Sequence, residues 1–186
     1  MFTWPFFLAV GFAFLDWACT WKGWKKRLYI AKPATLLFLI LWTVQVTRWE
    51  GGMLWFGIAL LFSLAGDIVL MLSPRYFMGG LAAFFFAHIA YLIGFNQSPA
   101  PLSMGVMLVA VLVGISAARA FRLLRPGILK VPRGKRFLTA AIGYGLTLTL
   151  MLLSALLTLF RPDWAQLPGY FAAGGAMLFY ISDTLL

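Results

Sequence analysis

The feature that most constrains this chain is a series of seven long apolar stretches. A helix that crosses a membrane needs about 20 mostly apolar residues, and each stretch approaches or meets that length. Only 11% of the 186 residues are charged and 63% are hydrophobic, whereas roughly a quarter of the residues in a soluble domain are charged. Too few polar residues remain to cover a water-facing surface, so we expect an all-α polytopic membrane protein. The predicted spans lie near residues 2–20, 33–48, 53–72, 77–95, 102–121, 137–157 and 169–186.

The boundaries of these spans come from helix-breaking residues. Lys32-Pro33 is predicted to open the second span, because proline fits the first turn of a helix. The seventh span ends at Leu186 without a closing basic residue. We therefore expect a single transmembrane helical domain, 1–186, that is truncated at its C-terminus and continues into an eighth helix. The small residue before Asp67 and the Leu three after it recur around Asp183; chance accounts for so short a match, although a repeat of two four-helix halves would also produce it.

The distribution of basic residues predicts the orientation. Of the 15 Lys and Arg residues, thirteen fall in the first, third and fifth loops and at their helix ends, and only Arg48 and Arg161 fall on the other side. Cytoplasmic loops carry the excess of Lys and Arg. The N-terminus and the Ser98–Pro101 loop should therefore lie outside, and Gly23 and Gly134 in the cytoplasm. In a bacterium this would be the inner membrane.

The net charge of +10 raises the question of a nucleic-acid partner. The charges cluster between apolar spans and not along a nucleic-acid-binding motif, so we expect an anionic lipid surface at the cytoplasmic loops and no nucleic acid. The single cysteine, Cys19, cannot form an intrachain disulfide, and the single histidine, His88, cannot supply a three-His zinc site. No metal or cofactor is expected, and the oligomeric state is left open.

Acidic residues inside the spans are the candidates for chemistry. Asp16, Asp67 and Asp183 fall within spans, where a charge costs at least about 2.5 kcal/mol and normally faces the bundle interior or water. Asp67 lies five residues from the cytoplasmic end of its span, roughly 7–8 Å inside, and Asp183 should lie at nearly the same depth. With Asp16 and Lys32 they predict a pocket open to the cytoplasmic leaflet, with the Asp67 and Asp183 carboxyls within a water's reach of each other.

Each of these residues also has a structural interpretation. Interhelical hydrogen bonding would explain Asp67 and Asp183, and a snorkelling surface position would explain Asp16. Lys32 fits an ordinary cytoplasmic lysine, or a phosphate contact aided by an adjacent helix N-terminus. Phe84, His88, Tyr91 and Phe95 share one helix face by spacing, and an interhelical hydrogen bond explains His88 about as well as catalysis does.

The order and spacing of several short motifs resemble the YhhN family, whose animal members are lysoplasmalogenases of the TMEM86 type. The resemblance runs along nearly the whole chain. The resemblance implies a membrane fold of eight helices. The matching residues are Lys32-Pro33, Gly66-Asp67, Pro74, Phe77, Gly80, Phe84-Phe85-Phe86-Ala87-His88-Ile89-Ala90-Tyr91, Gly175-Ala176, Phe179, Ile181, Ser182 and Asp183.

The resemblance implies hydrolysis of the vinyl ether bond of a lysoplasmalogen to a fatty aldehyde and a glycerophospho-base. Asp67 and Asp183 would then be the catalytic pair, one a protonated acid and the other an ionised carboxylate. The resemblance does not assign the two roles between them. His88, Tyr91 and Ser182 would support them, and Lys32 would hold the headgroup phosphate of the lysophospholipid.

A non-enzymatic transporter or lipid-binding protein is the alternative, because intramembrane carboxylates and repeated halves also occur in carriers. Broken helices beside the acids would favour it. Asp67 and Asp183 lie instead in unbroken apolar runs. A pure scaffold is weaker still, since it would not need two intramembrane acids at matched depth.

Overall fold

The computed structural model describes residues 3–130 and 134–184, without the side chains of Lys25, Lys135 and Arg136. Residue 2 of the first predicted span, residues 185–186 of the seventh, and Arg133 of the fifth loop lie outside the described residues. The regular structure of the described part is helical, as predicted. The chain divides into two compact units, Met1–Gly94 and Phe95–Leu186. The predicted single domain, the eighth helix and the repeat stay predictions.

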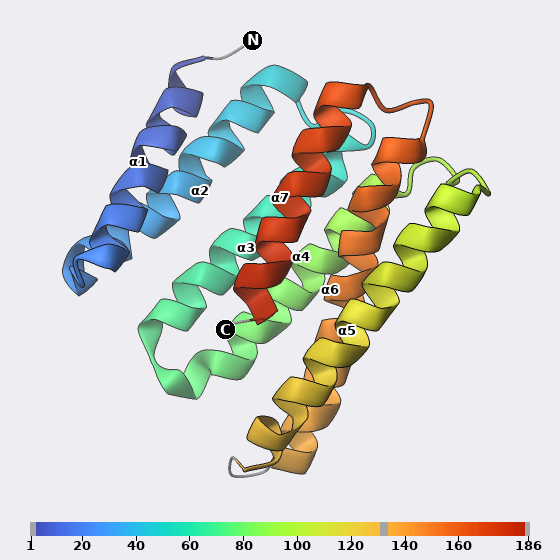
Figure 1. Ribbon diagram of the computed structural model, residues 1–186. Helices are drawn as coiled ribbons and strands as arrows, with labels where there is room; N and C mark the ends of the chain where they lie inside the picture. Colours follow the sequence, from blue (N-terminus) through green and yellow to red (C-terminus); the bar gives the residue numbers. More distant parts are fainter. Residues whose placement is uncertain (1–2, 131–133, 185–186) are drawn as a thin grey trace. The chain divides into compact units, whose positions relative to one another are not determined.

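The N-terminal unit is a pair of helical hairpins (Figure 1). The first hairpin packs α1 along α2, and α2 also contacts α3. Aromatic rings join α3 to α4: the ring centroids of Phe62 and Phe86 are 5.6 Å apart, and those of Phe56 and Tyr91 are 6.0 Å apart. The elements are α1 (Trp4–Trp21), α2 (Lys25–Thr47), α3 (Met53–Leu72), the 3-10 turn η1 (Pro74–Tyr76) and α4 (Phe77–Phe95).

The C-terminal unit contains three long helices, in which α6 contacts both α5 and α7. Its elements are α5 (Met104–Lys130), α6 (Gly134–Leu157), the 3-10 turn η2 (Thr158–Phe160) and α7 (Gln166–Thr184). Arg161, only 3% exposed, ties the C-terminal end of α4 and the residue after it to the segment before α7. Its guanidinium donates to the Phe95 carbonyl and, at 2.7 Å, to Asn96 Oδ1. Burial lowers the pKa of Arg161, and the nearby Asp163 carboxylate offsets only part of this effect. The guanidinium nevertheless remains protonated, as it does in proteins generally.

Six of the seven predicted spans are confirmed as helices long and apolar enough to cross a membrane. The third and fourth match their predicted bounds, 53–72 and 77–95. Helix α7 forms, but it is not among the six, so seven transmembrane helices are not confirmed. The reason is composition, because Gln166 opens α7 and its last turn reads Ser182, Asp183 and Thr184.

The start of the second helix was predicted wrongly. Helix α2 begins at Lys25, and Pro33 lies inside it, so Lys32-Pro33 does not open the helix. An internal proline removes one backbone hydrogen bond, here to the carbonyl of Tyr29. Tyr29 is exposed, so water or a lipid headgroup can reach that region. The close packing of α1 along α2 then holds the first turns in place.

The fifth helix is longer than predicted, since it continues past residue 121 to Lys130 with Pro126 inside it. Its 27 residues span roughly 40 Å at 1.5 Å per residue, which exceeds a hydrocarbon core of about 30 Å. The basic C-terminal turns therefore reach beyond the hydrocarbon. Large apolar side chains, including Phe7, Phe14, Leu108 and Leu178, remain exposed along the helices, as expected of surfaces that face lipid.

The predicted orientation can be tested by labelling single cysteines in intact cells. Gly134 is unsuitable as a probe site, because a Cβ there would lie 2.6 Å from the Ile128 carbonyl oxygen. We instead choose Leu102, which is 99% exposed, and Gly127, where a Cβ meets nothing within 4 Å. In a Cys19→Ala background, a membrane-impermeant maleimide should label Leu102→Cys and not Gly127→Cys until the cells are opened. The reverse pattern would overturn the orientation.

Candidate functional site

The centre of the N-terminal unit's candidate site is an ion pair between α2 and α3. Lys32 Nζ lies 2.8 Å from Asp67 Oδ1, with the lysine partly exposed. Asp67 is 7% exposed and continues the buried stripe of Ala59 and Ser63 at intervals of four residues along α3. A buried carboxylate without a counter-charge would be strongly unfavourable, and a cation in direct contact offsets that cost.

The contact also corrects the predicted surroundings of Lys32. The helix N-terminus that was expected beside Lys32 is at Lys25, about two turns away along α2. A phosphate at Lys32 would therefore gain nothing from that helix end. The charge of Lys32 instead pairs with Asp67 within the unit.

Asp16 is the second acid near Lys32. It lies on α1, and its carboxylate interacts electrostatically with the Lys32 ammonium. Its Oδ1 atom is buried without a hydrogen-bond partner among the described residues. The structure therefore brings three of the four predicted polar groups, Asp16, Lys32 and Asp67, into one neighbourhood.

Helix α4 carries the four side chains predicted to share one face, Phe84, His88, Tyr91 and Phe95. Phe84, His88 and Phe95 are buried, with Tyr91 half-buried on the same side. The Tyr91 side chain lies next to Ser63 of α3, one turn before Asp67. The His88 side chain, 0% exposed, therefore does not face lipid.

Close approach of α3 and α4 at this point depends on Gly66. A Cβ at Gly66 would lie 2.7 Å from the Phe84 ring. We expect Gly66→Ala to lower stability by about 1–3 kcal/mol, because the ring must shift in a packed interior. Thermal unfolding of the purified protein in detergent should show a lower midpoint.

Gly114→Ala is the matched control for that substitution. A Cβ at Gly114 meets nothing within 4 Å, and alanine favours a helix over glycine by about 1 kcal/mol. The midpoint of this variant should stay unchanged or rise. Equal destabilisation of both variants would contradict the packing role assigned to Gly66.

In the C-terminal unit, the carboxyl of Asp183 is held by a tyrosine. The Tyr144 hydroxyl donates a hydrogen bond to Asp183 Oδ2, joining α6 to α7. Tyr144 is 9% exposed. Tyr144 was not predicted from the sequence, although a signal was present: it stands between Gly143 and Gly145 inside the sixth predicted span. Ser182, predicted as a supporting residue, is exposed.

Asp67 and Asp183 belong to different units, so the predicted approach of their carboxyls stays a prediction. Within residues 3–130 and 134–184, no group of three or more His, Cys, Asp or Glu side chains is placed to hold a metal ion. What the two neighbourhoods offer chemically is a carboxylate beside an ammonium and a carboxyl beside a phenol. The first pair suits stabilisation of a cation, and the second suits proton transfer.

Comparison with known proteins extends these observations. Residues 28–186 match the model of the YhhN family. The chain is 32% identical over 185 residues to a lysoplasmalogenase TMEM86B of Mus musculus, an alignment that covers 98% of this chain and 71% of the mouse protein. It is 31% identical over 186 residues to the protein of the same name from Rattus norvegicus, covering 98% and 69%. No solved structure matches the chain.

Proposed function

The chain belongs to the YhhN family, and we propose that it is a membrane-embedded hydrolase that cleaves the vinyl ether bond of lysoplasmalogens. The products are a fatty aldehyde and a glycerophospho-base. The similarity to two lysoplasmalogenases supports the reaction class. The single observation that carries the proposal is the ion pair of Lys32 with the buried Asp67. It holds a carboxylate inside an apolar helix, where packing alone would not require one.

The reaction needs an acid and a stabilised cation. A carboxylic acid protonates the alkenyl carbon distant from the ether oxygen, and the adjacent carbon becomes an oxocarbenium ion. Water adds to that ion and returns a proton to the acid, which gives a hemiacetal. Collapse of the hemiacetal breaks the carbon–oxygen bond to the glycerol and releases the aldehyde. Paired carboxyl groups perform the equivalent tasks in glycoside hydrolysis.

We assign the ionised role to Asp67. The ammonium of Lys32 at 2.8 Å favours a charged carboxylate, and a carboxylate is the group that stabilises an oxocarbenium ion. Lys32 is then a positioning residue for Asp67. The phosphate contact predicted for Lys32 remains compatible with its partly exposed side chain.

We assign proton donation to Asp183. Its hydrogen-bond partner Tyr144 is a neutral hydroxyl, which can donate to a carboxylate or to the carbonyl oxygen of a carboxylic acid. Asp183 can therefore cycle between the two protonation states without losing this contact. His88, Tyr91 and Ser182 are proposed as supporting groups, with no cofactor or metal required.

The test is aldehyde release by the purified protein from a defined lysoplasmalogen. The saturated 1-alkyl ether and the 1-acyl lysolipid with the same chain are the controls, and only the vinyl ether should yield aldehyde. In deuterated water the aldehyde, trapped by reduction, should carry one deuterium at carbon 2, since that carbon receives the proton. Binding of the lipid without cleavage would contradict the enzyme and favour a lipid-binding protein.

A further inference from the structure

The turn between α1 and α2 carries positive charge that no acid in the neighbouring sequence balances. Lys22, Lys25, Lys26 and Arg27 lie in six consecutive residues, and no Asp or Glu occurs between Asp16 and Glu50. Among the described residues, the side chains of Lys22, Lys26 and Arg27 form no ion pair or hydrogen bond. This cluster takes no part in the proposed hydrolysis.

The backbone of the turn is well hydrogen-bonded and tight. The amides of Lys22 and Trp24 donate to the carbonyls of Ala18 and Cys19 at 2.9 Å. Gly23 has φ +67°, a left-handed conformation that glycine adopts without strain. The turn therefore presents its side chains from a defined backbone.

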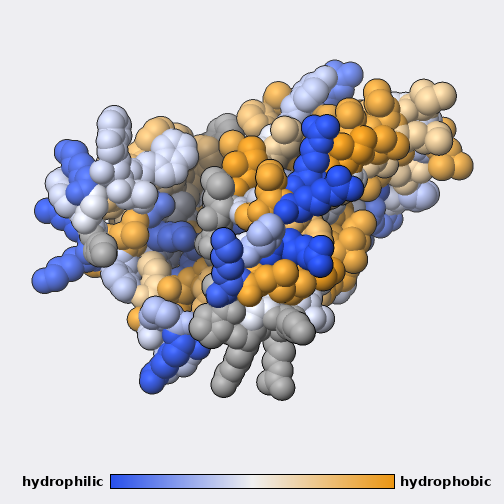
Figure 2. Space-filling view, turned by 60° about the horizontal axis from the view of Figure 1, so that its bottom comes forward, coloured by the Kyte–Doolittle hydropathy of each residue, from blue (hydrophilic) through white to orange (hydrophobic). Residues whose placement is uncertain are grey.

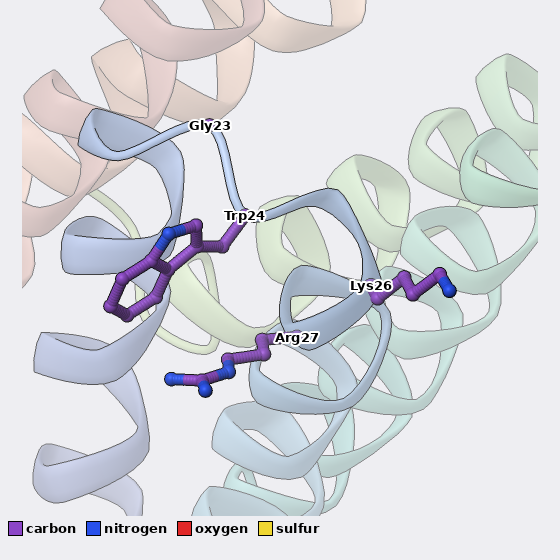
Figure 3. Close-up of a pocket in the computed structure, with 4 residues that line it drawn as sticks. All are labelled: Gly23, Trp24, Lys26 and Arg27. Atoms are coloured by element: carbon purple, nitrogen blue, oxygen red, sulfur yellow. The ribbon is translucent and has the colours of Figure 1, made fainter.

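Trp24 organises the cations around an open hollow. Lys22 Nζ lies 4.9 Å from the centre of the Trp24 ring, and Arg27 Cζ lies 4.5 Å from it, both within the range of cation–π attraction. A hollow of about 530 Å³ is lined by Gly23, Trp24, Lys26 and Arg27. Figure 3 shows the Trp24 ring and the Arg27 guanidinium on the same side of the turn, with Lys26 extending away from them.

The turn lies where two candidate spans, Trp4–Trp21 and Lys26–Thr47, meet, so it stands at a membrane–water boundary. Figure 2 shows hydrophilic side chains gathered over this end of the α1–α2 hairpin, at the left of the view. Trp17 and Trp21 on α1 are exposed, Trp21 by 93%. Exposed tryptophans are typical of the headgroup level of a bilayer.

We propose that the basic turn, defined as Lys22, Gly23, Trp24, Lys26 and Arg27, is a binding site for the phosphate of an anionic phospholipid. The guanidinium of Arg27 and the ammonium of Lys22, both beside the Trp24 ring, supply donors for phosphate oxygens, and Lys26 adds positive charge. The exposed indole rings supply an apolar contact for the glycerol and upper acyl region. A lipid is favoured over a free anion because the site combines uncompensated cations with exposed rings at the end of two spans.

The experiment measures fluorescence quenching of Trp24 in the purified full chain in detergent. Brominated phosphatidylglycerol is titrated into the protein, with brominated phosphatidylcholine of the same chains as the neutral probe. The contribution of Trp24 is the difference between the wild type and Trp24→Phe. Saturable quenching by phosphatidylglycerol, and weaker quenching by phosphatidylcholine, is the expected result.

The decisive comparison is between two triple variants with equal loss of charge. Lys22→Gln/Lys26→Gln/Arg27→Gln should weaken phosphatidylglycerol binding by about tenfold to 100-fold, since each cation near an anionic surface contributes about fivefold. Arg119→Gln/Arg122→Gln/Arg125→Gln removes three exposed cations from α5 and should leave it unchanged. Equal weakening in both variants would mean diffuse attraction, and no weakening in either would mean no site; both overturn the proposal.

Titration with inorganic phosphate distinguishes a lipid headgroup from a free phosphate ion as the ligand. At millimolar concentration it should compete only weakly with phosphatidylglycerol. If phosphate alone changes Trp24 emission and phosphatidylglycerol does not, the occupant is a free anion and the lipid proposal is wrong. Circular dichroism confirms that each variant is folded.

Discussion

Asp67→Asn should lower the rate of aldehyde release by a factor of about 10² to 10³, the usual cost of removing one group that stabilises charge in the transition state. Asparagine keeps the shape of aspartate and much of its hydrogen bonding, but it has no negative charge to stabilise an oxocarbenium ion. It also leaves the Lys32 ammonium without the carboxylate that lies 2.8 Å away. Steady-state aldehyde release from lysoplasmalogen, together with binding of the saturated ether analogue, gives the measurement.

Three further substitutions separate catalysis from structure. Glu50→Gln removes an exposed acid from the loop after α2 and should leave turnover unchanged. Lys32→Met should also slow the reaction, because Asp67 loses its cation in an apolar setting. Lys32→Arg preserves the charge and should restore a large part of the rate, whereas a purely structural contact would show its effect in thermal stability first. Normal turnover by Asp67→Asn would show that Asp67 is only structural.

The sequence predicted those parts of the fold that depend on local apolar pattern. Helices α3 and α4 match their predicted bounds because each is an uninterrupted apolar run that glycine or proline delimits. The start of α2 could not be predicted in the same way. The preference of proline for a first turn is local, whereas the packing of α1 along α2 is tertiary and sustains a helix through Pro33.

The acidic residues of the candidate site could be predicted from the sequence, but the side chains that contact them could not. The cost of a charge in hydrocarbon singles out Asp67 and Asp183 from the sequence alone. The partner of each acid depends on which face of a neighbouring helix it meets, and no spacing rule links Lys32 to Asp67 or Tyr144 to Asp183. The buried role of Arg161 was likewise hidden, because a loop arginine beside Asp163 has the sequence pattern of an exposed ion pair.

The second large effect is expected at Asp183. If it delivers the proton, Asp183→Asn should lower aldehyde release by about 10² to 10⁴, since an amide cannot protonate the alkenyl carbon. Tyr144→Phe removes only the hydroxyl that donates to Asp183. The net contribution of one hydrogen bond, about 0.5–1.5 kcal/mol, corresponds to a loss of roughly twofold to tenfold. Single-turnover measurements in ordinary and deuterated water report the proton-transfer step directly.

The relative size of these two effects decides the assignment. Tyr170→Phe, at an exposed tyrosine of α7, is the control for loss of a phenol and should leave the rate unchanged. A larger loss in Tyr144→Phe than in Asp183→Asn would make the phenol the proton donor and Asp183 its acceptor. Wild-type turnover by Asp183→Asn would remove Asp183 from the reaction. A large loss in Asp183→Asn with a changed solvent isotope effect, beside only the small loss in Tyr144→Phe, would follow from proton delivery by the Asp183 carboxyl. Orientation alone does not alter which group transfers the proton.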